Sequence, residues 1–245
     1  MTQTPKTPSS LTFGREKVTP AEGERRLRVV FERLAPYYDR LCDIQSLGLH
    51  RYWRKVFTKK VMQQRGRRIA DIAGGCGEIA HRLASPDCQV IVLDSSIAMM
   101  NKGRSSGLTG VDWVAGLARE LPFPAASMDT VTCAFGIRNL TYVSAGMQEI
   151  YRVLKPGGKF YCLEVSQPWP LVHPLFTAYC RYIVPRLGVL ITRQQDAYDY
   201  LVESIIDFPS QKELQNLLEK TGFIDVHSIS LTLRIACIHV STKPA

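Results

Sequence analysis

A glycine-rich turn between an apolar run and a helical segment constrains the fold of this chain more than any other feature. The stretch ADIAGGCGEIAHRLA, residues 70–84, ends its apolar run at Asp71 and then places Gly74, Gly75 and Gly77 close together. Glycine permits positive φ angles and lets a ligand approach the backbone closely. Doubly wound sheets bind ligands at the carboxyl ends of their strands, so the turn predicts a bound ligand.

Short β-rich runs alternate with helical segments from residue 67 onward. The runs are RRIADIA, QVIVLD, VDWVAG, MDTVTCAFG and GKFYCLEV, followed by the pair IDVHSISL and RIACIHVST. This alternation predicts parallel strands joined by helical crossovers, and near-continuous apolar strands predict a sheet covered on both faces. We therefore expect an α/β fold with a doubly wound, mostly parallel seven-stranded sheet that ends in an antiparallel pair.

The remaining segments are expected to flank this sheet within one domain. Residues 1–20 are rich in Thr, Pro, Ser and Lys, which predicts a mobile tail without the apolar region of a secretory signal. The segment 166–208 is too long for a loop and too apolar for a linker, so we expect a helical insertion over the sheet edge. A helix is expected to start at Ser210 and stop at Gly222. We expect residues 21–64 to form an N-terminal helical lid that is broken at Pro36, and residues 65–165 to form the cofactor-binding core. Residues 166–208 are the insertion for substrate, and residues 209–245 are the C-terminal helix with the strand pair.

The composition limits which partners the protein is expected to bind and which cellular compartment it is expected to occupy. Lysine and arginine number 31 against 22 acids, a net charge of +9 that is spread along the chain. This spread indicates a solvated basic surface and no nucleic-acid partner. Seven cysteines without a C-x-x-C pair predict free thiols in a reducing, cytoplasmic compartment. Five scattered histidines predict no metal site, and no apolar run is long enough to span a membrane.

Asp94 closes the next apolar run, VIVLD, and points to the cofactor. An acid at this place can accept two hydrogen bonds from ribose hydroxyls, so a nucleoside-containing cofactor is expected. Residues 75–80 also match the G-x-G-x-x-[GA] dinucleotide fingerprint, which leaves a nicotinamide-dependent oxidoreductase open. Asp71 favours S-adenosyl-L-methionine instead, because an acid suits its ammonium and sulfonium and would repel a pyrophosphate.

Several separate blocks resemble one enzyme family. The pattern Asp71-x-Ala73-x-Gly75-x-Gly77 resembles the first motif of S-adenosylmethionine-dependent methyltransferases, and RVLKPGGKFYCLEV resembles their segment before the fifth strand. The blocks LAPYYDRLCDIQSLGLHRYWRK, FGIRNL and YDYLVESIIDFPSQKELQNLLEKTGF resemble signatures of the ubiquinone/menaquinone biosynthesis C-methyltransferase family. The resemblance implies a Rossmann-like class I methyltransferase fold. It also implies methyl transfer to a ring carbon of a polyprenylated quinol, either demethylmenaquinol or the 2-polyprenyl-6-methoxy-benzoquinol precursor of ubiquinone.

The resemblance also implies a set of cofactor-binding residues: Asp71, Gly74, Gly75, Cys76, Gly77, Asp94, Ser95, Leu117, Ala118 and Ala134. Three of these positions depart from the family pattern, which commonly has threonine at Cys76, asparagine at Leu117 and serine at Ala134. Leu117 offers no polar side chain to an adenine, so recognition there is expected from backbone groups. The run LTLRIACIH also replaces a glycine-containing LTGGI-like run. We expect these departures to affect cofactor affinity more than the reaction.

Methyl transfer needs an electron-rich carbon in line with the sulfonium, which a quinol supplies once a hydroxyl loses its proton. Arg138 and Asn139 follow the fourth strand, where the methyl group is expected. Arg138 could stabilise a phenolate or orient a water as base, or it could pair structurally with a neighbouring acid. Tyr38, Asp39 and His50 are the other catalytic candidates, and each could instead serve helix packing or the surface.

Apolar side chains in the insertion could line a groove for the polyprenyl tail or pack onto the sheet: Trp169, Phe176, Tyr179, Tyr182 and Ile183. A lipid substrate and a basic surface together predict peripheral association with the inner face of a membrane, without insertion. A homodimer and the choice of quinol ring remain open. A non-catalytic scaffold member of a quinone-biosynthesis assembly is a further alternative, because the cofactor loop is altered.

Overall fold

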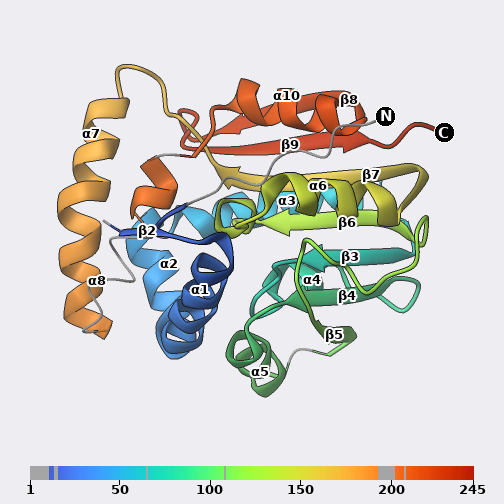
Figure 1. Ribbon diagram of the computed structural model, residues 1–245, viewed down its shortest axis with the longest axis horizontal. Coiled ribbons are helices and arrows are strands. Elements are labelled where there is room, and N and C mark those ends of the chain that lie inside the picture. The colour runs from blue at the N-terminus through green and yellow to red at the C-terminus, as the bar shows by residue number, and fades with distance from the viewer. Residues whose placement is uncertain (1–10, 14–15, 65, 108, 193–201, 207) are drawn as a thin grey trace.

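A seven-stranded sheet forms the centre of the computed structural model, which describes residues 11–13, 16–64, 66–107, 109–192, 202–206 and 208–245 (Figure 1). The strands lie in the order β5-β4-β3-β6-β7-β9-β8. The first five are parallel, and β9 pairs antiparallel with both β7 and β8. The predicted doubly wound sheet with a final antiparallel pair is therefore confirmed. The strand bounds are β3 Arg68–Ile72, β4 Gln89–Asp94, β5 Val111–Ala115, β6 Met128–Ala134, β7 Leu154–Val165, β8 Ile224–Leu231 and β9 Ala236–Thr242.

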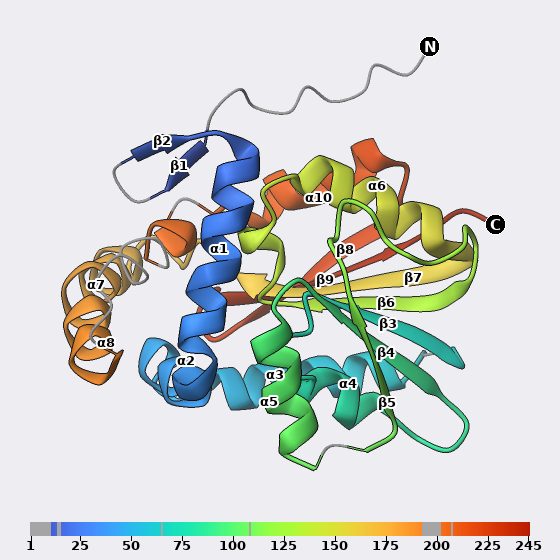
Figure 2. The ribbon, with the colours of Figure 1, turned by 60° about the horizontal axis from the view of Figure 1, so that its bottom comes forward.

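Helices cover both faces of this sheet. Figure 2 shows α6 and α10 on one face and α3 and α4 on the other. Alternate residues of β7 enter the two cores: Phe160 packs with α6 and α10, and Tyr161 packs with α3 and α4. The helix bounds are α1 Pro20–Leu34, α2 Tyr38–Ser46, α3 Leu49–Met62, α4 Glu78–Leu83, α5 Ile97–Ser105, α6 Val143–Val153, α7 His173–Ala178, α8 Val184–Thr192 and α10 Gln211–Thr221, and residues 202–206 are also helical.

The N-terminal segment is more ordered than the expected tail. Strands β1 Leu11–Phe13 and β2 Glu16–Val18 form an antiparallel pair, and α1 starts at Pro20, whereas the sequence placed all of 1–20 in the tail. The side chain of Thr19 accepts a hydrogen bond from Glu22 N, which caps the helix. Residues 1–10 lie outside the described part of the chain. The predicted break at Pro36 is confirmed, because a short 3-10 turn there separates α1 from α2.

The insertion is helical and lies at the carboxyl ends of the central strands (Figure 1). Helices α7 and α8 continue into each other through a π-helical segment, Tyr179–Ile183. This placement matches the predicted helical insertion, while residues 193–201 and 207 lie outside the described residues. Helix α10 begins after Ser210 with a complete capping box and ends at Gly222, as predicted.

Candidate active site

The glycine turn lies between the end of β3 and the start of α4, with its backbone in left-handed conformations. Ala73, Gly75 and Gly77 have φ angles of 52°, 56° and 74°. A Cβ atom at Gly77 would lie 2.6 Å from the Trp113 ring, and one at Gly74 would lie 2.8 Å from Asp71 Oδ2. Glycine is therefore required here both for conformation and for space.

Asp71 presents a buried carboxylate to this turn. Its Oδ1 accepts a hydrogen bond from Thr132 Oγ1 at 2.7 Å. No donor among the described residues reaches Oδ2, and that atom is buried. Burial raises the pKa of Asp71 to about 7, with the Asp94 charge adding to the rise. A buried acceptor without a donor fits a cationic ligand group, as the sequence predicted for the ammonium of S-adenosylmethionine.

Asp94 at the end of β4 holds the glycine turn in place. Gly75 N donates to Asp94 Oδ2 at 2.8 Å, and Ser96 N donates to Oδ1 at 2.8 Å. Burial raises the pKa of Asp94, although these backbone donors oppose the rise. The carboxylate therefore supports the turn directly, and Asp94 also lines a pocket beside it.

A pocket of about 840 Å³ opens between the sheet edge and α1. Six predicted cofactor residues line it: Gly75, Asp94, Ser95, Leu117, Ala118 and Ala134. Asp71, Gly74 and Cys76 line a smaller pocket on the other side of the turn, and Gly77 lines neither and caps α4. The sequence did not predict the wall from α1 and the segment after Asn139: Glu24, Leu27, Arg28, Phe31, Leu140, Thr141 and Tyr142. The amphipathic pattern of α1 predicted a helix, but it did not show where that helix packs.

A second pocket, of about 770 Å³, adjoins the first and contains His50 and Arg138. Phe31, Tyr38 and Phe135 line both pockets, so the two spaces share a wall. Most of the remaining lining is apolar, from α2, Trp53, Val165 and the insertion. The arrangement suits an aromatic ring carrying polar substituents beside a cofactor.

Arg138 is held by a buried acid. Its guanidinium pairs with Glu164 Oε1, and its backbone N donates to Glu164 Oε2 at 3.3 Å. The guanidinium carbon also lies 5.6 Å from the centre of the Phe135 ring. The alternative that Arg138 pairs structurally with an acid is thus what the structure shows, while the residue also lines the second pocket. Asn139 lines the first pocket and donates from Nδ2 to Phe135 O at 3.2 Å.

Glu164 is a residue that the sequence interpretation missed. It lies near the end of β7 in the run FYCLEV and is fully buried. The rule that singled out Asp71 and Asp94, an acid closing an apolar strand, applies equally to this position.

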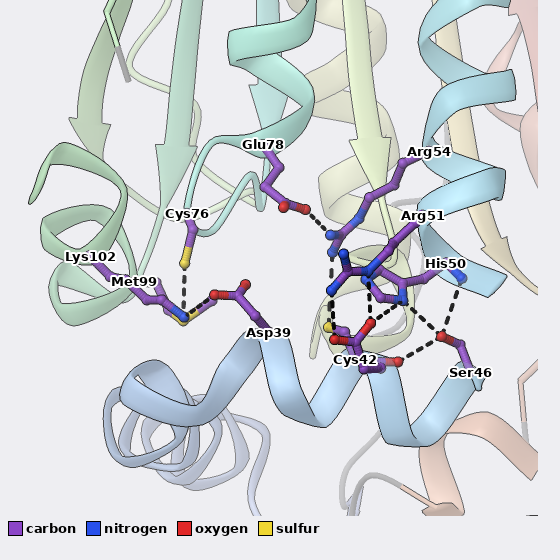
Figure 3. Close-up of polar contacts among 11 residues, drawn as sticks. Asp39, Cys42, Ser46, His50, Arg51, Arg54, Cys76, Glu78, Met99 and Lys102 are labelled. Carbon is purple, nitrogen blue, oxygen red and sulfur yellow. Dashed lines mark hydrogen bonds and ion pairs between the residues drawn. The ribbon is translucent and has the colours of Figure 1, made fainter. Parts of the chain in front are cut away.

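His50 is fixed in one orientation by Ser46 (Figure 3). Its Nδ1 lies 2.8 Å from Ser46 Oγ, and Ser46 Oγ donates to Cys42 O at 2.6 Å. Since the serine proton is engaged with that carbonyl, Nδ1 carries the imidazole proton and Nε2 is the acceptor. Burial, aided by the Arg54 charge, lowers the pKa of His50 to about 4. The imidazole is therefore neutral near neutral pH.

The structure separates the other two catalytic candidates. Tyr38 lines both large pockets, and its pKa is raised by neighbouring Cys42 and by burial, so its phenol stays protonated. Asp39 is largely exposed and pairs with Lys102 Nζ on α5 at 2.7 Å. It lines the small pocket beside the glycine turn and does not line the pocket of His50 and Arg138.

Three ion pairs connect the N-terminal helices to the cofactor-binding core. Asp39 of α2 pairs with Lys102, and Arg54 of α3 pairs with Glu78 beside the glycine turn (Figure 3). Arg119 pairs with Glu24 of α1 through two hydrogen bonds, at 3.0 and 3.2 Å. These pairs join α1, α2 and α3 to the core beside the pockets.

An apolar groove of about 1030 Å³ extends from the second pocket. Trp53, Phe176 and Ile235 line both spaces. Four of the five residues predicted for a tail groove line it, namely Phe176, Tyr179, Tyr182 and Ile183, together with Leu47, Leu49, Val172, Leu175 and Ala178. Trp169 does not line it and lies on the surface.

Comparisons with known proteins show what this chain is similar to in sequence and in fold. A model of the ubiE/COQ5 methyltransferase family matches residues 19–243. The ubiquinone/menaquinone biosynthesis C-methyltransferase UbiE of Rubrivivax gelatinosus is 43% identical over 239 residues, covering 98% of this chain and 95% of that protein. The mitochondrial 2-methoxy-6-polyprenyl-1,4-benzoquinol methylase of Drosophila melanogaster is 38% identical, covering 94% and 84%. A SAM-dependent methyltransferase of Thermotoga maritima shares the fold at a TM-score of 0.61, with 19% identity over 89% of this chain and 99% of that one.

Proposed function

The chain belongs to the ubiE/COQ5 methyltransferase family, and we propose that it methylates a ring carbon of a polyprenylated quinol. It is an S-adenosylmethionine-dependent C-methyltransferase of quinone biosynthesis. The proposed acceptors are demethylmenaquinol and the 2-polyprenyl-6-methoxy-benzoquinol, which differ in the ring. The observation that carries the proposal is the row of adjoining spaces, in which the Asp94 pocket shares lining residues with the pocket of His50 and Arg138, and that pocket shares others with the apolar groove.

The residues around the glycine turn fit the cofactor. The carboxylate of Asp71 would receive the ammonium, and Asp94 would receive the ribose hydroxyls. Backbone groups at Leu117 and Ala118 would meet the adenine. Bound S-adenosylmethionine supplies the electrophilic methyl group. The dinucleotide alternative is disfavoured because a pyrophosphate beside the buried carboxylate of Asp71 would be repelled.

The residues of the second pocket would handle the quinol proton. Neutral His50 offers Nε2 as a hydrogen-bond acceptor for the quinol hydroxyl, in the orientation that Ser46 fixes. Arg138 carries a permanent charge in an orientation that Glu164 fixes, so it would stabilise the developing phenolate. After the ring carbon gains the methyl group, it loses its hydrogen as a proton and the hydroxyl is restored.

The apolar groove would hold the first isoprene units of the tail. Apolar surface placed there leaves water, which favours binding by roughly 25 cal/mol per Å². No helix among the described residues is long and apolar enough to cross a membrane. We propose peripheral association with the membrane, because a polyprenyl substrate partitions into the bilayer.

The test is methyl transfer from radiolabelled S-adenosylmethionine into the two quinols, measured side by side. We expect label in the ring of at least one quinol, and inhibition by S-adenosylhomocysteine. The matched control is Asp71→Asn, which keeps the shape of the side chain but removes the charge. If the purified protein binds S-adenosylhomocysteine and labels neither quinol, the proposal fails and the scaffold alternative is favoured.

A further inference from the structure

Large apolar side chains are exposed together around the apolar groove. Leu171, Leu175 and Leu47 are 93%, 74% and 73% exposed. Contiguous exposed apolar surface marks sites of interaction with proteins or membranes. We call this set the apolar collar, and its members are Leu47, Trp169, Leu171, Leu175, Tyr182 and Leu233.

The apolar collar comes from three chain segments that meet at one end of the molecule (Figures 1 and 2). Trp169 N donates to Leu233 O at 3.1 Å, which ties the start of the insertion to the turn between β8 and β9. Tyr179 donates from its hydroxyl to Ile44 O, which ties the insertion to α2. Leu47, Leu175 and Tyr182 line the groove itself. The collar therefore includes part of the groove wall.

Two members of the collar adopt unfavourable backbone angles. Leu47 has a φ angle of 50° and Leu233 one of 54°. Positive φ is uncommon for residues other than glycine, and bulky side chains adopt it at a cost. Leu47 is the left-handed C-cap of α2, where its backbone N donates to Asp43 O and Ile44 O. Both leucine side chains are exposed, so the two turns present apolar side chains to the surroundings.

Two arginines of the insertion lie near the collar residue Tyr182. The segment 166–192 contains Arg181 and Arg186 and no acid, and both arginines are exposed. The Arg186 guanidinium lies 5.9 Å from the centre of the Tyr182 ring, so the cation borders the apolar surface. Arginine beside exposed aromatic and aliphatic groups matches a membrane interface, where the charge meets headgroup phosphates. A second copy docked about a two-fold axis would bring like charges together.

We propose that the apolar collar binds to the surface of an anionic lipid bilayer. Arg181 and Arg186 would then contact the headgroup phosphates, and the groove would open toward the acyl chains. The inference rests on the proposed function, because the groove is the place where a polyprenyl tail would be held. A tail could then pass from the bilayer into the groove without crossing water.

The first experiment measures binding of the full chain to sedimenting vesicles of phosphatidylcholine, with and without phosphatidylglycerol. We expect binding that requires phosphatidylglycerol and weakens with salt. Trp169 is 51% exposed and serves as an internal reporter. Its fluorescence should shift to the blue on binding, and Trp169→Phe should remove the shift.

Two variants test the surface itself. Leu171→Glu places a charge where an apolar contact is expected, and it should weaken vesicle binding by about tenfold or more. Arg181→Gln with Arg186→Gln should weaken binding to anionic vesicles by about fivefold per arginine. The matched control is Ile224→Glu, a 47% exposed position at the start of β8, at the other end of that strand from the collar. It should bind as the wild type does.

The methyl-transfer assay separates this inference from the proposed function. Leu171→Glu should keep wild-type turnover on a short-chain quinol in solution and lose it on a long-chain quinol embedded in vesicles. If no quinol is methylated, the proposed function fails, and vesicle binding and the Trp169 shift still decide the docking surface. Unchanged vesicle binding by Leu171→Glu, no binding by the wild type, or a dimer that this variant dissociates would each overturn the inference.

Discussion

Glu164 fixes Arg138 twice, through its guanidinium and through its backbone N. The pair is buried where the second pocket meets the ends of β6 and β7, so the arginine holds its charge in one orientation. A fixed donor costs no reorganisation when negative charge develops on a substrate oxygen. The same burial makes the pair important for stability, because removal of one member leaves the other charge without compensation.

Arg138→Ala and Arg138→Lys should both lose turnover by about 10²–10³, because lysine lacks the planar fork that engages Glu164 and the quinol together. Affinity for S-adenosylhomocysteine should stay near the wild-type value, since the contact is with the acceptor. Arg138→Ala should also lower the free energy of unfolding by about 3–5 kcal/mol. Steady-state rates and calorimetric affinities should therefore come from the same folded preparations. Near-normal turnover in Arg138→Ala would remove the arginine from the mechanism.

Asp94→Ala should weaken cofactor binding by tenfold or more, because charge-assisted hydrogen bonds contribute about 1.5–3 kcal/mol each. The variant also frees Gly75 N, so the glycine turn should lose protection from hydrogen exchange. Asp94→Asn is the matched control, since an amide oxygen can still accept from one backbone N. An unchanged dissociation constant in a folded Asp94→Ala protein would show that the ribose is bound elsewhere.

Asp71 should make cofactor affinity depend on pH. Its pKa of about 7 means that the carboxyl group is largely protonated below pH 7 when no cation is near. Binding of a cation lowers that pKa, so the complex holds fewer protons and affinity should rise with pH up to about 7, at most tenfold per pH unit. Above that range the contribution of Asp71 should be constant.

The control for this titration is Asp71→Asn. The variant should bind S-adenosylmethionine more weakly at neutral pH, and it should lose the part of the pH dependence that comes from the carboxyl group. Calorimetry in buffers of different ionisation enthalpy should show proton release for the wild type near pH 7. Identical pH profiles for the two proteins would mean that Asp71 is ionised throughout.

The parts of the site predictable from the sequence are those encoded by local pattern. Asp71 and Asp94 each close an apolar strand, and parallel strands bring such ends to one edge, so their proximity followed from the fold. Glu164 obeys the same rule, one residue before the end of β7, so the same local pattern would have predicted it. The capped helix from Ser210 to Gly222 followed from side chains alone.

The parts that were not predictable depend on packing between distant segments. Glu24 and Phe31 reach the cofactor pocket only because α1 crosses it, and helical periodicity does not give that direction. Gly48 occupies the cap position of α3 in a left-handed conformation and offers no side chain to cap this helix. Ser46 instead accepts from His50 N at 3.2 Å and orients the ring, a role that requires the observed turn.

Leu117→Asn should change cofactor affinity only modestly, within about 1 kcal/mol. Leu117 lines the cofactor pocket, and backbone groups there can hydrogen-bond an adenine without help from the side chain. The neighbouring ion pair between Arg119 and Glu24 should persist in this variant, so the midpoint temperature of its thermal unfolding should match that of the wild type. A hundredfold gain in affinity would show that the natural leucine impairs the cofactor site.

His50→Ala should lower turnover by about 10²–10⁴ while leaving cofactor affinity unchanged, because we propose that neutral His50, which lines the second pocket, accepts the quinol proton. With a pKa of about 4, the imidazole should stay neutral, so protonation of His50 should not lower the rate between about pH 8 and pH 6.

Ser46→Ala removes the partner of Nδ1 and should cause a smaller loss of turnover than His50→Ala, with a changed ¹⁵N tautomer signature for His50. His50→Gln, which retains a polar side chain but cannot take up the proton, should resemble His50→Ala. If His50→Ala keeps its turnover, the quinol proton leaves through a water held near Arg138.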